Sequence, residues 1–246
     1  TVIISRSMEN LGVQARELFG VKLGEWQLKA LHTYEEELLI WNAHTNLTAI
    51  RERQEVRVKH FLDAISCLTV MKDIRRQRLV DIGTGAGFPG LVLKILCPAL
   101  EVTLVDSVKK KTAFCQHMVQ VLGLDGVTVV TARAEDLGQQ PVHRQRYDWA
   151  VARAVARLPV LLEYCLPLVS TGGSLLAQKG ESAPAEAQSA EYAAAVLGGS
   201  LEKLVPVELP GVTECRYLVI YRKIAPTPQK YPRRAGIPAK SPLLPP

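Results

Sequence analysis

The sequence lacks the features that mark an exported or membrane-spanning protein. No apolar run approaches the roughly 20 residues that cross a bilayer, and the start, TVIISRSMEN, leads into polar, helix-like sequence rather than an apolar signal core. There is no C-x-x-C pair, and no histidine stands at metal-ligand spacing from the cysteines, which are Cys67, Cys97, Cys115, Cys165 and Cys215. We therefore expect reduced thiols in a cytoplasmic protein, with no membrane partner and no metal.

Residues 222–246 lack acidic side chains altogether, although the whole chain carries 24 acids against 30 bases. This segment alone accounts for the net charge of +6, through Arg222, Lys223, Lys230, Arg233, Arg234 and Lys240. A local excess of this kind suits a polyanionic partner, because lysines and arginines that neutralise phosphates release condensed counterions. The alternative is a tail that only keeps the protein in solution.

The first part of the chain has a helical pattern. Apolar residues make up 48% of the chain and charged residues 22%, values that exclude a disordered or fibrous protein. Over residues 10–69 the apolar side chains recur at three- and four-residue spacing. Asn46 and Thr48 precede the second helical stretch and belong to the residue types that cap helix starts. The sequence predicts an N-terminal helical extension at residues 1–72.

From residue 78 the pattern changes to short β-branched runs separated by helix-length segments. Because the runs are apolar on both faces, they predict a buried, mostly parallel sheet. An alanine-rich helix is expected near 183–197, and runs on either side of Pro210-Gly211 predict a closing antiparallel hairpin. The expected parallel strands are residues 78–82, 101–106, 127–132, 147–153 and 173–179, and the hairpin strands are 203–209 and 215–223.

This layout predicts an α/β fold of the class I AdoMet methyltransferase type, a Rossmann-like doubly wound sheet, at residues 73–225. Residues 226–246 hold seven prolines and several basic side chains. Proline removes backbone donors, so this segment predicts a basic, extended C-terminal arm rather than a regular helix or central strand.

A glycine loop, VDIGTGAGFPGL at residues 80–91, leaves the first strand and enters a helix. Gly83, Gly85 and Gly87 remove side chains where the backbone must turn and approach a ligand closely. Gly85, Gly87 and Gly90 also satisfy G-x-G-x-x-G, so the loop alone does not separate NAD from AdoMet. A tight turn without a ligand is the remaining alternative.

Neighbouring residues favour AdoMet over NAD. Asp81 ends the first strand, where methyltransferases of this fold carry an acid near the methionine ammonium, and Phe88 starts the helix with an aromatic ring over the cleft. Too little chain remains for the second domain of a dehydrogenase. Asp106 ends the second strand at a spacing that suits ribose hydroxyls, or it caps the next helix. Ala134 and Glu135 follow the third strand, placed to flank and hydrogen-bond adenine.

Longer motifs, spread from Trp41 to Leu243, together resemble the RsmG (GidB) family of 16S rRNA guanine-N7 methyltransferases. They are WNAHTNLTAI with KHFLDAIS, VDIGTGAGFPGL, ARAED, DWAVARAVA, AQKG, ECRYLVIYRK and YPRRAGIPAKSPL. The resemblance implies S-adenosyl-L-methionine as cofactor and 16S rRNA, or an assembling small ribosomal subunit, as partner. The cofactor-site residues that it implies are Gly83, Phe88, Ala134 and Glu135, with Arg153 at the border between cofactor and substrate.

The same resemblance implies a set of contacts to RNA phosphate. The candidates are Lys179, Arg216, Lys230, Arg233, Arg234 and Lys240. Lys179 has the alternative of an ordinary exposed lysine, and Arg153 that of a structural ion pair. His60 and Asp63 match an H-x-x-D motif of the family but are also typical helix-packing and capping residues. Deletion of the arm is expected to weaken RNA binding far more than AdoMet binding.

The chemistry implied by the resemblance needs no catalytic side chain. Guanine N7 carries a free lone pair, so methyl transfer requires no general base and depends on alignment of the reacting atoms. Two other functions remain open at the level of the sequence. One is a class I methyltransferase of a small molecule or protein, and the other is a nucleotide-binding regulatory protein without catalysis.

Overall fold

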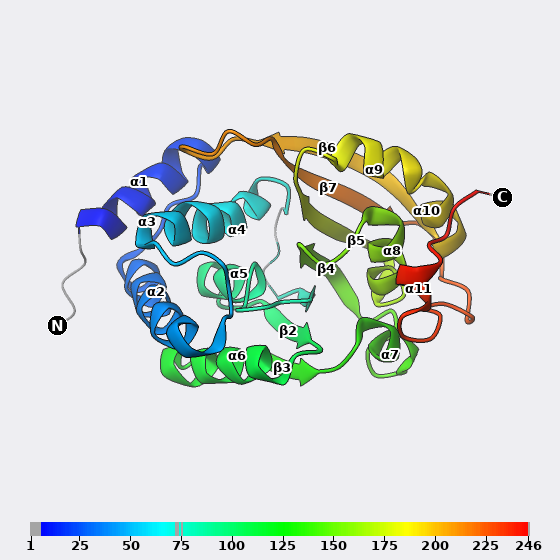
Figure 1. Cartoon of the computed structure of the whole chain (residues 1–246), viewed down its shortest axis with the longest axis horizontal. Helices are drawn as coiled ribbons and strands as arrows, with labels where there is room; N and C mark the ends of the chain where they lie inside the picture. The colour runs from blue at the N-terminus through cyan, green and yellow to red at the C-terminus, as the bar shows by residue number, and fades with distance from the viewer. Residues whose placement is uncertain (1–5, 72–73, 75, 246) are drawn as a thin grey trace.

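A mixed sheet of seven strands lies at the centre of the computed structural model, which describes residues 6–71, 74 and 76–245 (Figure 1). The strand order is β3-β2-β1-β4-β5-β7-β6. The strands are β1 (Arg78–Ile82), β2 (Glu101–Asp106), β3 (Val127–Thr131), β4 (Tyr147–Arg153), β5 (Val169–Lys179), β6 (Gly199–Val207) and β7 (Arg216–Lys223). Two sequence predictions, the domain boundary between residues 72 and 73 and the absence of a signal core at the first five residues, fall outside the described residues.

The first five strands run parallel, and β7 is antiparallel to both β5 and β6. This confirms the doubly wound α/β fold with its closing hairpin. The chain moves outward from β1 to β2 and β3, then returns to β4 on the other side of β1. The carboxyl ends of β1 and β4 therefore form the switch point at which sheets of this kind bind ligands.

Two hydrophobic cores pack against the sheet. Leu79 and Leu176 belong to one core and their neighbours Val80 and Leu175 to the other. Since successive side chains of a strand point to opposite faces, the two cores cover the two faces of the sheet. The first core also contains Met8, Leu31 and Phe61, so the N-terminal helices share their core with the sheet.

The N-terminal helices lie on the left of the sheet in Figure 1. They are α1 (Arg6–Phe19), α2 (Glu25–Thr45), α3 (Arg53–Val56), the π-helical turn η1 (Arg57–Leu62), α4 (Asp63–Ser66) and the 3-10 turn η2 (Cys67–Thr69). The expected capping role of Asn46 and Thr48 at the second helical stretch is wrong. Asn46 has a φ of 48° and ends α2, whereas α3 begins after Glu52. A short polar residue tolerates this left-handed conformation, which ends a helix rather than starting one.

The remaining helices connect and follow the strands. They are α5 (Gly90–Leu96), α6 (Lys109–Leu122), α7 (Ala134–Gln139), α8 (Leu158–Cys165), α9 (Ala183–Ser189), α10 (Glu191–Leu197) and α11 (Ile237–Lys240). The alanine-rich segment thus forms two helices that meet at Ala190 rather than one. None of the helices described is both long and apolar enough to cross a membrane.

The C-terminal arm packs on α7 and α8, on the right in Figure 1. Arg144 donates to the carbonyl oxygens of Thr227 (2.9 Å) and Tyr231 (2.7 Å), and Gln139 donates to that of Pro232 (2.7 Å). The arm is extended as predicted except at α11, where the sequence predicts no helix. Proline is tolerated there because it stands in the first turn, whose N–H groups have no partner within the helix.

A buried lysine anchors the start of the arm. The Lys223 ammonium donates to the carbonyl oxygens of Leu166 (2.8 Å) and Leu197 (3.0 Å) and to the hydroxyl of Thr227. Burial lowers the pKa of Lys223 to about 7, and the charge of Arg144 adds to this effect. These three acceptors match the three N–H groups of an ammonium, so the residue joins the end of β7 to the arm.

Candidate functional site

The glycine loop adopts a backbone that other residues rarely take. Gly83, Gly85 and Gly87 have φ angles of 67°, 60° and 94°. A Cβ atom at Gly83 would stand 2.5 Å from the Val155 side chain, and one at Gly87 would collide with Leu91 and with the Tyr34 hydroxyl, which stands 2.5 Å away. Gly85 has open space around its Cβ position, since its nearest neighbour is a backbone oxygen 3.9 Å away. The loop therefore packs tightly at Gly83 and Gly87 and is open at Gly85.

Asp81 holds the loop from below. Its Oδ2 accepts hydrogen bonds from the Thr84 hydroxyl (2.7 Å) and the Gly90 N–H (2.8 Å), while no partner for Oδ1 lies among the described residues. Burial is the main reason that the pKa of Asp81 is raised, to about 6. A buried carboxylate oxygen without a partner is costly, so Asp81 suits a cationic ligand at this point.

Two hollows meet at Gly83. The smaller one, the strand-end hollow, has a volume of about 90 Å³ and contains the predicted residues Asp106, Ala134 and Glu135. The larger one, the basic hollow, has a volume of about 330 Å³ and lies between the loop and the N-terminal helices. Its cationic lining residues are Lys59, Lys111, Arg153 and Arg216. The structure therefore brings Asp106, Glu135, Arg153 and Arg216 together in one crevice around Gly83 and Gly85. Two predicted residues, Asp81 and Gly87, line neither hollow.

Asp106 and Glu135 bind backbone N–H groups at the strand-end hollow. The Asp106 carboxylate accepts from Gly85 N–H (3.0 Å) and Val108 N–H (2.9 Å), so it serves both the glycine loop and the entry to α6. Glu135 accepts from Gly236 N–H in the C-terminal arm at 2.9 Å. The arm thus contacts a wall of the hollow, a contact that the sequence gives no reason to expect.

Phe88 supports the wall of the basic hollow and does not project over the cleft. It is 3% exposed, and its ring stacks on Tyr34 and on His60 with centroid distances of 5.0 and 4.4 Å. The Arg153 guanidinium lies 5.1 Å from the centroid of the same ring. The hydroxyl of Tyr34 donates to the Ala86 carbonyl, which fixes the loop above this stack.

His60 is neutral in this environment. The pKa of His60 is lowered to about 3, mainly by burial and secondly by the positive charge of Arg153. Arg153 has only donors, so His60 Nδ1 accepts its hydrogen bond (3.0 Å). His60 Nε2 therefore carries the ring proton and donates to the Thr48 hydroxyl at 3.0 Å. Both ring nitrogens are engaged in holding the wall of the hollow.

Asp63 lies beneath the two arginines of the basic hollow and accepts hydrogen bonds from both. Arg153 is thus an ion-pair partner and a lining residue at once. Asp63 is therefore an ion-pair partner of two arginines, and not only a helix-packing or capping residue, the alternative that the sequence leaves open. The only signal for them in the sequence is the H-x-x-D motif, because the partners are 90 and 153 positions away.

Of the six predicted RNA contacts, Arg216 is the one that lines the basic hollow. Lys179 pairs with Glu186 at 2.7 Å, and Arg233 pairs with Glu163, whose side chain is fully buried, at 2.6 Å. Lys230, Arg234 and Lys240 are exposed on the arm. These placements leave the three exposed cations available to a partner and give Lys179 and Arg233 acidic partners within the chain.

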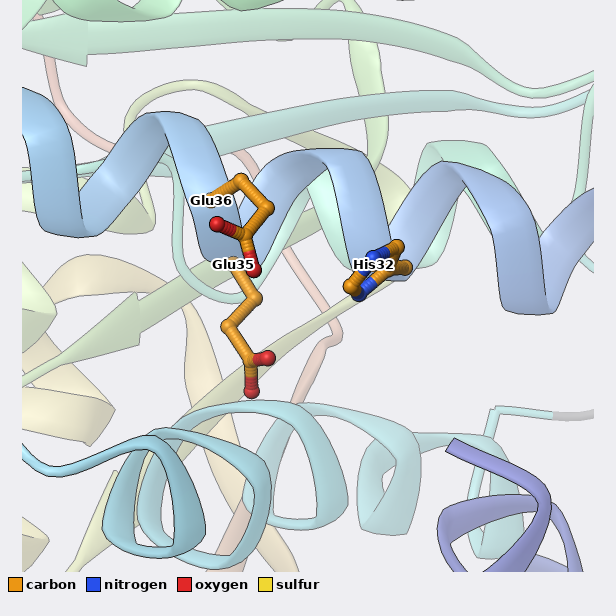
Figure 2. A group of neighbouring side chains, drawn as sticks. All are labelled: His32, Glu35 and Glu36. Carbon is orange, nitrogen blue, oxygen red and sulfur yellow. The ribbon is translucent and has the colours of Figure 1, made fainter. Parts of the chain in front are cut away.

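Figure 2 shows His32, Glu35 and Glu36 on α2. The side-chain nitrogen and oxygen atoms with which these residues could bind a metal ion lie within 4.8 Å of one another. Arg57 pairs with Glu35 at 2.7 Å, and Arg53 pairs with both Glu35 and Glu36. Because these two guanidiniums already neutralise the two carboxylates, we interpret the group as an ion-pair network that joins α2 to α3 and η1, and assign no metal to it.

Comparison with known proteins gives consistent matches over most of the chain. The profile of the GidB family, described as rRNA small subunit methyltransferase G, matches residues 27–212. The ribosomal RNA small subunit methyltransferase G of Roseiflexus castenholzii is 52% identical over 226 residues, which cover 92% of this chain and 96% of the relative. That of Alkaliphilus metalliredigens is 46% identical over 224 residues, 91% of this chain and 94% of the relative.

Solved structures support the fold. A SAM-dependent methyltransferase from Aquifex aeolicus aligns with a TM-score of 0.54 and 16% identity over 72% of this chain and 97% of that chain. TrmN from Thermus thermophilus aligns with a TM-score of 0.52 and 20% identity over 68% and 53% of the two chains. At these identities the similarity concerns the arrangement of strands and helices alone.

Proposed function

The chain belongs to the GidB family of rRNA small subunit methyltransferases, and on that premise we propose that it transfers a methyl group from AdoMet to N7 of a guanine in 16S rRNA. The observation that supports this most directly is the meeting of two chemically different hollows at Gly83. One offers carboxylates to a nucleoside, and the other offers cations to a polyanion. A group bound in the first is thereby placed against a substrate bound in the second.

The residues of the crevice fit AdoMet. The Asp106 carboxylate would accept the ribose hydroxyls, and Ala134 and Glu135 would contact adenine. Asp81 is fully buried and lines neither hollow, but its unpartnered oxygen suits the positive charge of the methionine ammonium. Gly83 lines both hollows, and Gly85, which lines the basic hollow, leaves the loop backbone open to a ligand there. When bound, AdoMet supplies an electrophilic methyl group on a positively charged sulfur.

The chemistry at N7 asks little of the protein beyond alignment. The N7 lone pair would take up the methyl group that AdoMet supplies, and no proton would have to leave the base. His60 has both ring nitrogens hydrogen-bonded and a pKa of about 3, so it holds Arg153 rather than acting as a base. The side chains around the hollow serve to fix the two reactants.

The basic hollow suits a guanosine that is unpaired or flipped out of its helix, because a stacked base does not reach a cleft of this kind. Lys59, Lys111 and Arg216 line it and are partly exposed. Each also has an acidic partner within the chain, Lys59 with Glu55 at 2.6 Å, Lys111 with Asp106 at 3.7 Å and Arg216 with Asp63 at 2.9 Å, so a phosphate beside the base would share these cations with the acids. The proposed partner is 16S rRNA, free or within an assembling small subunit in the cytoplasm. Lys230, Arg234 and Lys240 extend the basic surface along the arm.

Methyl transfer by the purified protein is expected to yield 7-methylguanine in small-subunit rRNA. This product is a cation, which makes the labelled nucleotide sensitive to alkali. The pH-rate profile should show no essential base near neutrality, because N7 has no proton to lose. Radiolabelled AdoMet, followed by alkaline cleavage and mapping of the label, tests both points. Label on a carbon, an exocyclic amine or a ribose oxygen would contradict the proposed chemistry.

Asp106→Ala is expected to weaken AdoMet binding by about ten- to a hundredfold, the effect of losing charge-assisted hydrogen bonds of about 1.5 to 3 kcal/mol. Isothermal titration measures the change. Asp148→Ala is the matched control. The Asp148 carboxylate also accepts a hydrogen bond from a backbone N–H, that of Arg78 at 2.8 Å, but it lies at the start of β4 and outside the crevice. An unchanged dissociation constant in folded Asp106→Ala would remove this residue from the cofactor site.

A further inference from the structure

We propose that Asp63 is a positioning residue that holds Arg153 and Arg216 together and aims Arg216 at a phosphate of the substrate RNA. The proposal rests on the proposed function, since it concerns how the substrate is held in the basic hollow. Its basis is one buried carboxylate shared by two guanidiniums, that of Arg153 at the end of β4 and that of Arg216 at the start of β7.

The contacts define a fork. The Arg216 side chain binds Asp63 with two donors, Nε to Oδ1 at 2.9 Å and Nη2 to Oδ2 at 3.1 Å. Arg153 Nη1 reaches the same Oδ2 at 3.1 Å. Two parallel hydrogen bonds between a guanidinium and a carboxylate fix the plane of the guanidinium as well as its position. Asp63 therefore sets the orientation of Arg216.

Asp63 is buried and anchored through its backbone. Its side chain is 3% exposed. The Asp63 carbonyl accepts hydrogen bonds from Ser66 Oγ at 2.6 Å and from Gln178 Nε2, in β5, at 2.7 Å. The bond from Gln178 ties the start of α4 to β5, so the backbone of Asp63 is a fixed point from which both arginines are positioned.

The two arginines then have different roles. Arg153 is 13% exposed and spends its donors on Asp63, on the Lys59 carbonyl (2.9 Å) and on His60. The Arg216 side chain is 27% exposed, and Asp63 is its only hydrogen-bonding partner in the part of the chain that the structure describes. Its Nη1 therefore remains for a ligand in the hollow. An RNA phosphate is the ligand that matches a fixed guanidinium surrounded by other cations.

Charge explains why the acid is needed. Two guanidiniums that meet without a carboxylate between them repel each other, and the more exposed one, Arg216, would turn toward water. One carboxylate between two arginines leaves a net charge of +1, so the hollow remains attractive to phosphate. Asp63 thus acts on the substrate through Arg216 without touching it.

The test is the kinetics of Asp63→Asn on small-subunit rRNA. The substitution keeps the size of the side chain and removes its charge. We expect KM for RNA to rise by about ten- to a hundredfold, as for the loss of charge-assisted hydrogen bonds, while the AdoMet dissociation constant stays within about twofold. Glu35→Gln is the matched control, since it neutralises another fully buried, arginine-bound carboxylate outside both hollows. An equal rise in KM for the control would overturn a specific role of Asp63.

A double-substitution cycle shows whether Asp63 acts through Arg216. Asp63→Asn should cost clearly less in an Arg216→Gln background than in the unmodified chain, because the arginine that it positions is gone. Equal costs in the two backgrounds would overturn the proposal.

Arg216→Lys is a second variant that covers poor folding of Asp63→Asn. It keeps the charge at a partly exposed position and loses the two-donor fork, so KM for RNA should rise. An unchanged KM would overturn the role of the oriented fork. The unmodified protein separates the two hypotheses: if it does not methylate rRNA the proposed function fails, and if it does while both variants keep its KM only the role of Asp63 fails.

Discussion

Gly87→Ala is expected to lower the free energy of unfolding by about 2 to 5 kcal/mol. The left-handed conformation costs a residue with a Cβ about 1 to 2 kcal/mol, and overpacking of a core adds about 1 to 3 kcal/mol. Both apply here, because φ is 94° and the added Cβ would collide with Leu91 and the Tyr34 hydroxyl. A loss of this size is a large share of the roughly 5 to 15 kcal/mol that stabilises a domain.

Denaturant unfolding of Gly87→Ala measures this loss, with Gly20→Ala as the matched control. Gly20 also has a positive φ, 69°, but nothing lies within 4 Å of its added Cβ. The control therefore carries the backbone strain without the collision. If the two variants lose the same stability, the packing around Gly87 does not contribute and the loop is looser than described.

The glycine loop illustrates what a sequence can predict. The spacing of Gly83, Gly85 and Gly87 predicts a turn between a strand and a helix, and all three have positive φ angles. The sequence pattern does not distinguish the three glycines, however, and only the folded structure shows that their surroundings differ. Gly83 and Gly87 are surrounded by side chains from Val155 and from Tyr34, which are far away in the sequence, whereas Gly85 faces open space.

Deletion of residues 226–246 is expected to weaken AdoMet binding as well as RNA binding. The sequence predicts a loss confined mainly to RNA, because it treats the arm as a separate basic segment. In the structure Glu135, in the strand-end hollow, accepts from Gly236 N–H, and buried Glu163 depends on Arg233. Loss of one partner of a buried ion pair typically costs about 3 to 5 kcal/mol, so the deletion should also lower the stability of the domain.

Two point variants separate the two roles of the arm. Arg233→Gln should lower stability and AdoMet affinity, since Glu163 loses the charge that compensates it. Replacement of Lys230, Arg234 and Lys240 by glutamine should leave AdoMet affinity unchanged and reduce the log-log salt slope of RNA binding by about 2 to 3 units. An unchanged slope for the triple variant would mean that the arm cations do not contact phosphate. Unchanged stability and AdoMet affinity for Arg233→Gln would mean that the arm does not support the hollow.

The strands are the best predicted part of the chain, because a buried parallel sheet needs apolar runs that are visible locally. The bounds expected for residues 78–82, 101–106 and 147–153 coincide with β1, β2 and β4. The partners of charged side chains are not visible in this way. The acids that pair with Arg153, Arg216 and Arg233 lie 70 to 153 positions away in the sequence, so the residues next to each arginine do not indicate its partner.

The hydrogen bond from Gly236 to Glu135 joins residues 101 positions apart, and this has a consequence for how the protein is made. Synthesis starts at the N-terminus, and the early parts of a chain fold first. A nascent chain can therefore complete its parallel strands while the support behind Glu135 is still unmade. The cofactor pocket would then mature only after Gly236 has been synthesised, and products that terminate before Gly236 would remain without full affinity for AdoMet.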